Sequence, residues 1–495
     1  MNETTESYWN ATVDVATLAS IESMDGHPLS IEIVNETSDF AALSTEWEDL
    51  VCQTPATIFQ TFDWQFLWWK HFGSRPEHHL FVLIFRSQGR LVGIAPFFIQ
   101  STSFLHFTIF RRLKLLGSGL LSHPSPLLSL ERQGPSDYLD IVAAPGYEAA
   151  VSKAFVTVLC SELYLWDEIE LQNIPGKGLI STYVLPMIEP EGYSITKTEE
   201  DVCPMIALPK SLEEYFLSLR HSVRRNLRYV YRGYLENKEF QIEDIVAGGN
   251  ARGGVQVLSQ LHQKRWNAVG YPGLFSDARF GPFAEEVAQV LANKGRLWFK
   301  ILRRDGKAIA ANFVFRFKNR FYTYMSGFDR DSGSSSGNSG AGTSLVLLAV
   351  ADAIKNGIDE IDLGRGTEPY KSQLTSLVNK NWRITIGSIE IRGRAFRILL
   401  SRTYFAWLRL VSRVLCEISI FTIVTGQKGA LHALQGYCSH VWYRLASKNS
   451  DPFAQKTPPQ ASNQNTGSAS SPSHAPVENT SKKQKHENKK FQIKD

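Results

Sequence analysis

The polar residues best suited to chemistry concentrate in the stretch Gly-Arg-Gly-Thr-Glu-Pro-Tyr-Lys, residues 364–371. The preceding IDEIDLG alternates apolar residues with acids and predicts a short strand. Polar side chains just past the carboxyl end of a strand often line a site in α/β proteins. Asp362, Glu368, Tyr370 and Lys371 are therefore candidate functional residues. Each also has a structural interpretation, since Asp362 can cap a loop and Tyr370 can pack.

A glycine- and serine-rich loop, Asp329 to Gly342, comes before this strand and leads into a helix expected from about Thr343. The free backbone N–H groups of such a loop, with the positive end of the helix dipole, suit a phosphate or pyrophosphate. Gly340, Gly342 and Thr343 are the candidate ligands. No Lys-Ser/Thr pair follows the glycines and no G-x-G-x-x-G occurs, so this is neither a Walker loop nor a dinucleotide fingerprint. An ordinary surface loop before a packed helix is an equally good interpretation.

A second candidate anion site lies in the HSVRRNLRYVYR segment, residues 221–232. Its helix is predicted to follow the capping-box pattern Ser-Leu-Glu-Glu at 211–214. Arg224, Arg228 and Arg232 recur every four residues and so share one helix face, and Arg225 adds a neighbour. Guanidinium groups in a row suit phosphates or carboxylates. The alternative is a solvated basic face, and the scarcity of neighbouring acids favours binding.

The elements that would position these residues occur twice. The hairpin FRSQGRLVGIAPFF is matched by LRRDGKAIAANFVF, and the strand DEIEL by DEIDL, in the same order along the chain. Gly89 corresponds to Gly306, and Asp167 to Asp359. We therefore predict two similar α/β units. The residues 101–136, which hold several turn signals, are interpreted as an insertion in the first unit.

Composition fits a globular protein. The 495 residues are 43% hydrophobic and 12% aromatic, enough for two or three domains. A net charge of +4 is too small to indicate a nucleic-acid-binding protein. Five scattered Cys, with no C-x-x-C pair, disfavour a disulfide framework or a zinc site and favour a reducing compartment. Neither a secretory signal nor a run of about 18 apolar residues is present. The aromatic-rich stretch 59–72 is interpreted as a core helix, with a substrate wall as the alternative.

The C-terminal region differs from the rest. Residues 396–424 predict a helical segment with arginines near one face, which more often packs against the protein but can also lie on an acidic membrane surface. From about residue 447 the Ser-, Pro-, Gln-, Asn- and Lys-rich tail cannot form a core, so disorder is expected.

Several stretches together resemble the CelD-like acetyltransferases of cellulose and exopolysaccharide gene clusters. These belong to the GNAT superfamily and are close to the FemAB-type tandem-GNAT transferases. The resemblance rests on WEDLV…FQTFDWQFLWWKHFG, GRLVGIAPFF, HSVRRNLRYVYR, LHQKRWNAVG, DGKAIAANFVF, YTYMSGFDR and the stretch GAGTSLVLLAVADAIKNGIDEIDLGRGTEPYK. It covers roughly Leu29 to Arg392. Where the family commonly has a Ser-Pro-Gly-like helix entry, this chain has Gly340-Ala341-Gly342-Thr343, and the superfamily's pyrophosphate-loop motif has no clean match.

The resemblance implies acyl transfer from an acyl-CoA, with acetyl-CoA first, to an amine or hydroxyl of a sugar or cell-envelope precursor, without a metal or DNA. Such a reaction needs a general base and a donor to the carbonyl oxygen. Candidate catalytic residues are Asp362, Glu368, Tyr370 and Asp329. Candidate cofactor-binding residues are Arg224, Arg225, Arg228, Gly340, Gly342, Thr343 and Lys371. Two alternatives remain: a FemAB-like aminoacyltransferase that uses aminoacyl-tRNA, and an inactive GNAT-fold scaffold.

The expected fold class is α/β (α+β), with tandem GNAT-like domains that each hold a mixed central sheet flanked by helices. The predicted divisions are a flexible leader at 1–28, a first GNAT-like domain at 29–200 and a second, acetyltransferase domain at 201–393. Basic amphipathic helices at 394–446 and a disordered tail at 447–495 follow. The expected location is the cytoplasm, with peripheral contact with the inner membrane through 396–424 as an alternative.

Overall fold

Residues 27–104, 107–119, 134–161, 166–246, 249–268, 273–329 and 340–387 are described by a computed structural model. All of them lie in one unit, Met1–Phe453. The predictions for the basic helices at 394–446 and for the tail fall outside these residues, as does nearly all of the predicted leader.

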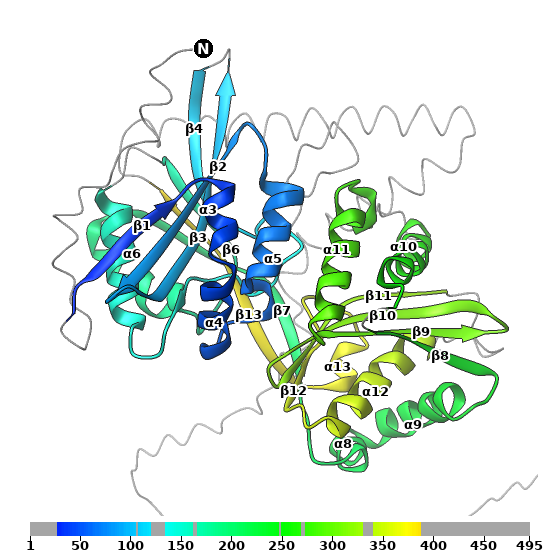
Figure 1. Cartoon of the computed structure of the whole chain (residues 1–495). Coiled ribbons are helices and arrows are strands. Elements are labelled where there is room, and N and C mark those ends of the chain that lie inside the picture. The colour runs from blue at the N-terminus through cyan, green and yellow to red at the C-terminus, as the bar shows by residue number, and fades with distance from the viewer. Residues whose placement is uncertain are drawn as a thin grey trace, which may run out of the picture. The chain divides into compact units, whose positions relative to one another are not determined.

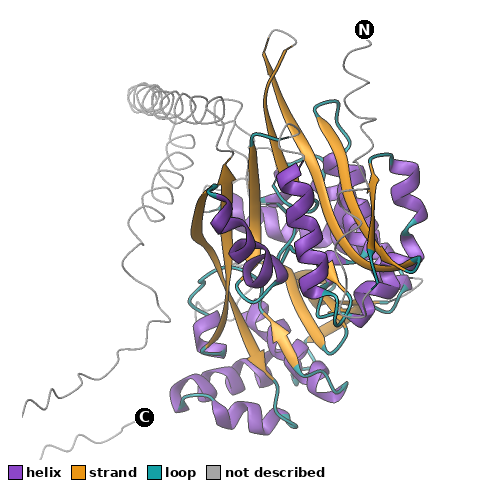
Figure 2. Cartoon of the chain, turned by 90° about the vertical axis from the view of Figure 1, so that its left-hand side faces the viewer, coloured by secondary structure: helices purple, strands orange, loops and turns teal. Residues whose placement is uncertain are grey.

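The described strands form one mixed sheet of 13 strands, with helices against both of its faces (Figures 1 and 2). The first half contributes β1 (Leu29–Val34), β2 (His78–Ser87), β3 (Arg90–Phe104), β4 (Phe107–Leu115), β5 (Val142–Ala143), β6 (Glu168–Pro175) and β7 (Ser194–Ala207). The second half contributes β8 (Phe240–Ile245), β9 (Leu297–Arg304), β10 (Lys307–Phe317), β11 (Arg320–Phe328), β12 (Glu360–Asp362) and β13 (Leu377–Gly387). The predicted α/β class with a mixed, helix-flanked sheet is confirmed.

The two halves repeat the same pairing order. In each half, four strands pair antiparallel in sequence, β1 to β4 and β8 to β11. A later strand of each half then runs parallel to the fourth, so β6 pairs with β4 and β12 with β11. The last strand of each half is exchanged: β7 pairs with β12, β13 pairs with β6, and β7 and β13 pair with each other. This repeat is what the internal duplication predicts.

The matched hairpins have matching turns. Gln88 and Gly89 have φ of 51° and 77°, and Asp305 and Gly306 have φ of 50° and 76°. Two consecutive left-handed residues make the tight turn whose twist suits a two-residue hairpin. One expectation nearby is wrong: residues 101–115 are not an insertion. Residues 101–104 end β3 and residues 107–115 form β4, and β4 takes the same place in its half as β11 does in the second.

The helices of the first half are α3 (Thr37–Ala42), α4 (Ser44–Gln53), α5 (Phe62–Trp68), α6 (Glu148–Ser161) and α7 (Leu185–Ile188), with the short turns η1 (Ile58–Gln60), η2 (Trp69–Gly73), η4 (Ile180–Val184) and η5 (Glu189–Glu191). Those of the second are α8 (Leu212–Ser218), α9 (His221–Leu235), α10 (Ala251–Asn267), η6 (Leu274–Ser276), α11 (Phe280–Asn293), α12 (Gly340–Lys355) and α13 (Lys371–Leu374). On the second half, α10 and α12 cover opposite faces of β10 and β11 (Figure 1).

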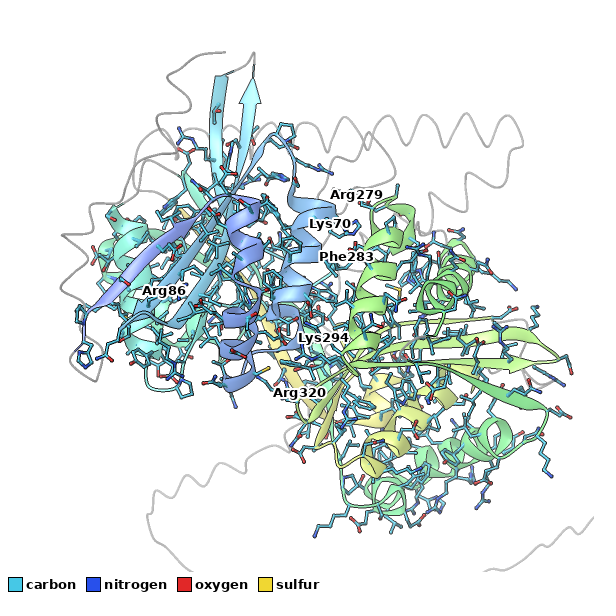
Figure 3. All side chains as sticks on the ribbon, in the orientation of Figure 1. Lys70, Arg86, Arg279, Phe283, Lys294 and Arg320 are labelled. Atoms are coloured by element: carbon cyan, nitrogen blue, oxygen red, sulfur yellow. The ribbon has the colours of Figure 1, made fainter. Side chains whose placement is uncertain are left out.

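The aromatic-rich stretch forms core, as its packing interpretation requires. Trp64 and Trp68 are buried, and the Trp64 ring contacts Phe283 of α11 with centroids 5.2 Å apart. At the rim of this junction Lys70 pairs with Glu286 at 2.7 Å (Figure 3). The first half's helices therefore pack directly on a helix of the second half.

Candidate functional site

The parallel strands β11 and β12 separate soon after they meet. They pair only at Arg320, Phe321 and Tyr322 of β11. Beyond that point the chain after β12 turns toward β7, where the N–H of Leu363 donates to Pro204 O and that of Gly366 to Val202 O, both at 2.9 Å. From Thr323 to Phe328, β11 therefore has no strand partner on this side within the described residues. The divergence leaves an open strand edge beside the segment 364–371.

The N-terminus of α12 follows β11 in the chain, after residues 330–339, which lie outside the described ones. The helix begins at Gly340, three residues earlier than expected, so Gly340, Gly342 and Thr343 all lie in its first turn. A Cβ on Gly340 would lie 3.0 Å from Tyr234 of α9, and one on Gly342 would lie 3.0 Å from Phe328. These glycines thus permit close packing of the helix start against α9 and β11. The first-turn N–H groups of a helix have no partner within that helix and favour anions.

Two buried polar side chains under α12 have no hydrogen-bond partner among the described residues. They are Asn312 of β10, with both amide atoms unpaired, and Thr323 of β11. Asn312 is 1% exposed. Val314 pairs with Thr323 across the two strands, and Asn312 lies two residues before Val314, so both side chains point to the face that α12 covers. Buried polar atoms without a protein partner mark positions where a bound molecule can complete the hydrogen bonds, and Thr323 lies on the strand with the open edge.

Lys371 holds the segment after β12 in shape. Its side chain is 3% exposed, and its ammonium donates to the carbonyls of Gly364 at 3.0 Å and Arg365 at 2.8 Å. It also pairs with Glu368 at 2.9 Å. Burial works to lower its pKa, but the charges of Glu368 and Tyr370 outweigh this and raise the pKa. The predicted phosphate contact of Lys371 therefore competes with three partners that the ammonium already has.

Asp362 is 1% exposed, and both its carboxylate oxygens are engaged. One accepts the N–H of Gly364 at 2.7 Å, and the other accepts the hydroxyl of Tyr138 from the first half. Burial raises its pKa to about 6, although the two hydrogen bonds and Arg320 lower it. The geometry makes Asp362 a residue that shapes the end of β12.

Asp329, at the end of β11, is likewise enclosed. Its side chain is 2% exposed and pairs with Lys264 of α10 at 2.6 Å and Lys307 of β10 at 3.3 Å. Both oxygens thus have cationic partners, and any base chemistry at Asp329 would have to displace one of them.

Glu368 and Tyr370 remain the accessible pair. The Glu368 side chain is 42% exposed, and Tyr370 is half-buried. Burial raises the pKa of Tyr370, while Lys371 and Arg265 of α10 act to lower it. The Arg265 guanidinium in turn lies 4.7 Å from the ring centre of Phe328, at the end of β11. Both predicted residues belong to the segment 364–371, which Lys371 holds in shape, and Tyr370 lies near the end of β11.

The arginines of α9 occupy another surface. The buried side of α9, with Leu227 and Tyr234, faces the core, and the exposed side lines a groove of 740 Å³. The groove is lined by Leu217, His221, Arg224, Arg225, Arg228, Tyr229, Arg232, Gly233 and Asn237. Arg228 pairs with Glu213. Arg224, Arg225 and Arg232 have no carboxylate partner among the described residues, so the groove is strongly basic.

Sequence reasoning missed the first half's contribution. Arg365 pairs with Asp137 at 3.0 Å and donates to Gly134 O at 2.6 Å, and the neighbouring Tyr138 binds Asp362. Tyr138 is buried and has φ of 56°, a left-handed conformation rare for a large side chain and more frequent at functional sites. The only signal was the spacing Asp-Tyr-Leu-Asp at 137–140, which local pattern alone interprets as the start of a strand.

Comparisons with known proteins agree with this geometry for the second half. Residues 221–372 match the family model "Acetyltransferase (GNAT) domain". That range covers α9 through the first residues of α13, including every candidate residue of the second half. The match assigns a GNAT-type domain, of the acyltransferase class, to this part of the chain. No curated protein sequence matched.

Among solved structures the similarities are remote. FemX has 9% identity and a TM-score of 0.47, covering 72% of this chain and 96% of FemX. L-PGS from Bacillus licheniformis has 11% identity and a TM-score of 0.40, covering 74% and 96%. A tandem GNAT protein from the clavulanic acid biosynthesis pathway has 10% identity and a TM-score of 0.38, covering 73% and 100%. Nothing about the substrate of this chain follows from such distant structures, and the CelD-like resemblance stays a prediction.

Metal-binding and membrane-spanning features are both absent from the described residues. No group of three or more His, Cys, Asp or Glu residues there is arranged to hold a metal ion. Nor does any described helix combine the length and apolar character needed to cross a membrane.

Proposed function

We propose that the chain transfers an acyl group from an acyl-CoA, acetyl-CoA in the first instance, to an amine or hydroxyl of a sugar or cell-envelope precursor. The observation that carries the proposal is the divergence of β11 from β12, with the N-terminus of α12 next in the chain, inside the region that matches the GNAT domain. An open strand edge can pair with an extended chain that has amide groups. A helix N-terminus suits a pyrophosphate. Acyl-CoA has both an extended arm with amide groups and a pyrophosphate.

The residues present fit such a donor. Asn312 and Thr323 offer unpaired polar atoms under α12, Thr323 on the strand with the open edge, and Gly340 and Gly342 let the first turn of α12 pack closely against α9 and β11. Backbone N–H groups of that edge would hold the oxyanion that develops on the thioester carbonyl. Arg265 adds a positive charge at the end of β11.

Glu368 is the proposed general base, because its carboxylate is more exposed than those of Asp362 and Asp329. It would accept the proton of the acceptor as the nitrogen or oxygen attacks the thioester carbon. The C–S bond then breaks, and Tyr370 would give its proton to the leaving thiolate. Asp362, Asp329 and Lys371 would position the reacting groups without touching them.

The experiment is a thiol-release assay of the full chain with acetyl-CoA and a panel of amine and hydroxyl acceptors, alongside calorimetric titration of acetyl-CoA. We expect micromolar binding of acetyl-CoA. The Glu368→Gln variant should turn over more slowly by about two orders of magnitude or more, with little change in acetyl-CoA affinity. Glu191→Gln, an exposed acid of η5, is the control. Absence of binding by acetyl-CoA and by longer acyl-CoAs would refute the proposal.

A FemAB-like aminoacyltransferase is the second candidate, and the α9 groove is the observation that favours it. Its exposed arginines point away from the packed side of α9 and suit an anion larger than a pyrophosphate. Charged tRNA that binds the full chain, and binds at least tenfold more weakly to Arg225→Ala/Arg232→Ala, would support this donor. An inactive scaffold would bind neither donor.

A further inference from the structure

A cavity of 630 Å³ lies where the two halves meet, and none of the candidate catalytic residues lines it. Its lining includes residues 175–179 at the end of β6, Glu148 at the start of α6, and Val378, Asn379, Lys380 and Trp382 of β13. The end of β6 in the first half corresponds to the end of β12 in the second half, together with the segment that follows it. Its volume is in the range that small-molecule sites occupy.

One wall of the cavity is acidic. Asp140 is 5% exposed, and its Oδ1 accepts the N–H groups of Ile141 and Ile180, each at 2.9 Å. A Cβ on Gly178 would overlap its other carboxylate oxygen, so the glycine leaves room for the carboxylate. Burial raises the pKa of Asp140 to about 7, although three backbone hydrogen bonds lower it. Glu148 supplies a second carboxylate to the lining.

The remaining charged side chains of the lining are cationic: Lys177, Lys197, Arg320 and Lys380. Arg320 pairs with Glu360 at 2.6 Å and Lys380 with Glu199 at 2.8 Å, so their charges are balanced. Lys197 lies 4.8 Å above the ring of Trp382. Neither Lys177 nor Lys197 has a carboxylate partner among the described residues. Two cations are therefore available to an anion.

The cavity also has a direct connection to the second half. Tyr138 forms part of its wall and gives its hydroxyl hydrogen to Asp362 at the end of β12. A ligand in the cavity would thus contact the same tyrosine that helps shape the segment carrying Glu368 and Tyr370.

We propose that this cavity binds a small molecule that carries both an amine and an anionic group, a phosphate or a carboxylate. Its ammonium pairs with Asp140 and Glu148, and its anion with Lys177 and Lys197. The charges of both signs in the lining select such a ligand over a neutral sugar or a simple anion, because each missing group leaves the charges of one sign unpaired. The role of this molecule as the acyl acceptor rests on the proposed function, whereas its binding does not.

The test is calorimetric titration of the full chain, at pH 8, with glucosamine 6-phosphate as the probe. Glucosamine and glucose 6-phosphate each lack one charge, and glucosaminic acid, the open-chain amino acid, carries a carboxylate at C1 and no phosphate. We expect the probe or glucosaminic acid to bind at least tenfold more tightly than either singly charged sugar. The tighter of the two identifies the anion.

Lys177→Glu and Lys197→Glu should each weaken that binding at least tenfold. Both side chains are exposed, so the fold should tolerate the changes, and Lys355→Glu at the end of α12 is the matched control. No binding of either doubly charged molecule, equal binding of glucose 6-phosphate, or no effect of the two variants would overturn the proposal. Acetyl-CoA is titrated in parallel: if it fails to bind while the probe binds, the acyltransferase proposal fails and the site remains.

Discussion

The hydrogen bond from Tyr138 to Asp362 gives the sharpest test of the contact between the halves. Tyr138→Phe removes the hydroxyl and leaves one oxygen of a buried carboxylate without its partner. A hydrogen bond to a charged group contributes about 1.5–3 kcal/mol, and one between neutral groups about 0.5–1.5 kcal/mol. The loss of stability should therefore depend on whether Asp362 is ionised.

The direction follows from the pKa of Asp362, about 6 in the folded protein against 3.8 for an unperturbed aspartate. A raised folded-state pKa means that this group stabilises the fold fully below about pH 4, and that the stabilisation is lost as the pH rises through 6. The Tyr138 bond lowers that pKa, so its removal raises the pKa further. We expect Tyr138→Phe to reduce the free energy of unfolding by about 1 kcal/mol at pH 5 and by about 2–3 kcal/mol at pH 8.

The assay is urea unfolding of the full chain at both pH values, followed by fluorescence. Tyr215→Phe is the matched control, since Tyr215 is also buried but donates to a backbone carbonyl, that of Leu374, at 3.3 Å. Its effect should be the same at pH 5 and pH 8. If Tyr138→Phe shows no greater loss at pH 8 than at pH 5, Tyr138 does not bond to an ionised Asp362, and the contact between the halves is not as described.

Three further predictions concern the same region. Asp140→Asn should become more stable relative to the unchanged chain between pH 5 and pH 8.5, by about 2–3 kcal/mol, because the folded-state pKa of about 7 lies above 3.8 and ionisation opposes folding; urea midpoints across this range measure it. Lys371→Met should lower the free energy of unfolding by about 2–3 kcal/mol, which is less than the loss of a fully buried ion pair costs because Glu368 is 42% exposed. An unchanged melting temperature would show that Lys371 does not hold the segment 364–371 in place. Gly327→Ala should lower the free energy of unfolding by about 1–3 kcal/mol, because the added Cβ would lie 2.8 Å from the backbone nitrogen of His262 in α10. Gly281→Ala is the control: it has open space around it and should be neutral or slightly stabilising in the same thermal melts.

Local sequence patterns predicted the elements that depend on neighbours in the chain. Ser211 accepts the N–H of Glu214 at 3.2 Å, as its capping pattern requires. Gly357, with φ of 66°, follows α12 in a left-handed conformation that favours glycine, and the N–H of Ile358 bonds back to Ala353 O at 3.0 Å. These features need only a few consecutive residues, so the sequence displays them directly.

The candidate site was less predictable because its contacts join distant residues. Asp362 and Tyr138 are 224 positions apart, and nothing local in either segment indicates the other. The sequence also does not show which side chains are exposed. Asp329 and Asp362 are residue types suited to acid–base catalysis, but packing encloses both of their carboxylates, whereas the carboxylate of Glu368 is accessible. Residue type suggested the chemistry, but the tertiary contacts determine which groups can reach a substrate.

The exchange of strands explains why these distant contacts arise. β7 follows the first half in sequence but pairs with β12, and β13 follows the second half but pairs with β6. The predicted boundary at 200/201 falls inside β7, so a cut there would divide a strand that β12 and β13 both need. Because the exchanged strands place the two halves edge to edge, the segment 134–140 comes to lie against the end of β12. Asp137 then pairs with Arg365, and Tyr138 bonds to Asp362. Arg365 thereby gains a charged partner and Asp362 a second hydrogen bond, both from the first half, which makes the first half part of the site whether or not it binds a substrate of its own.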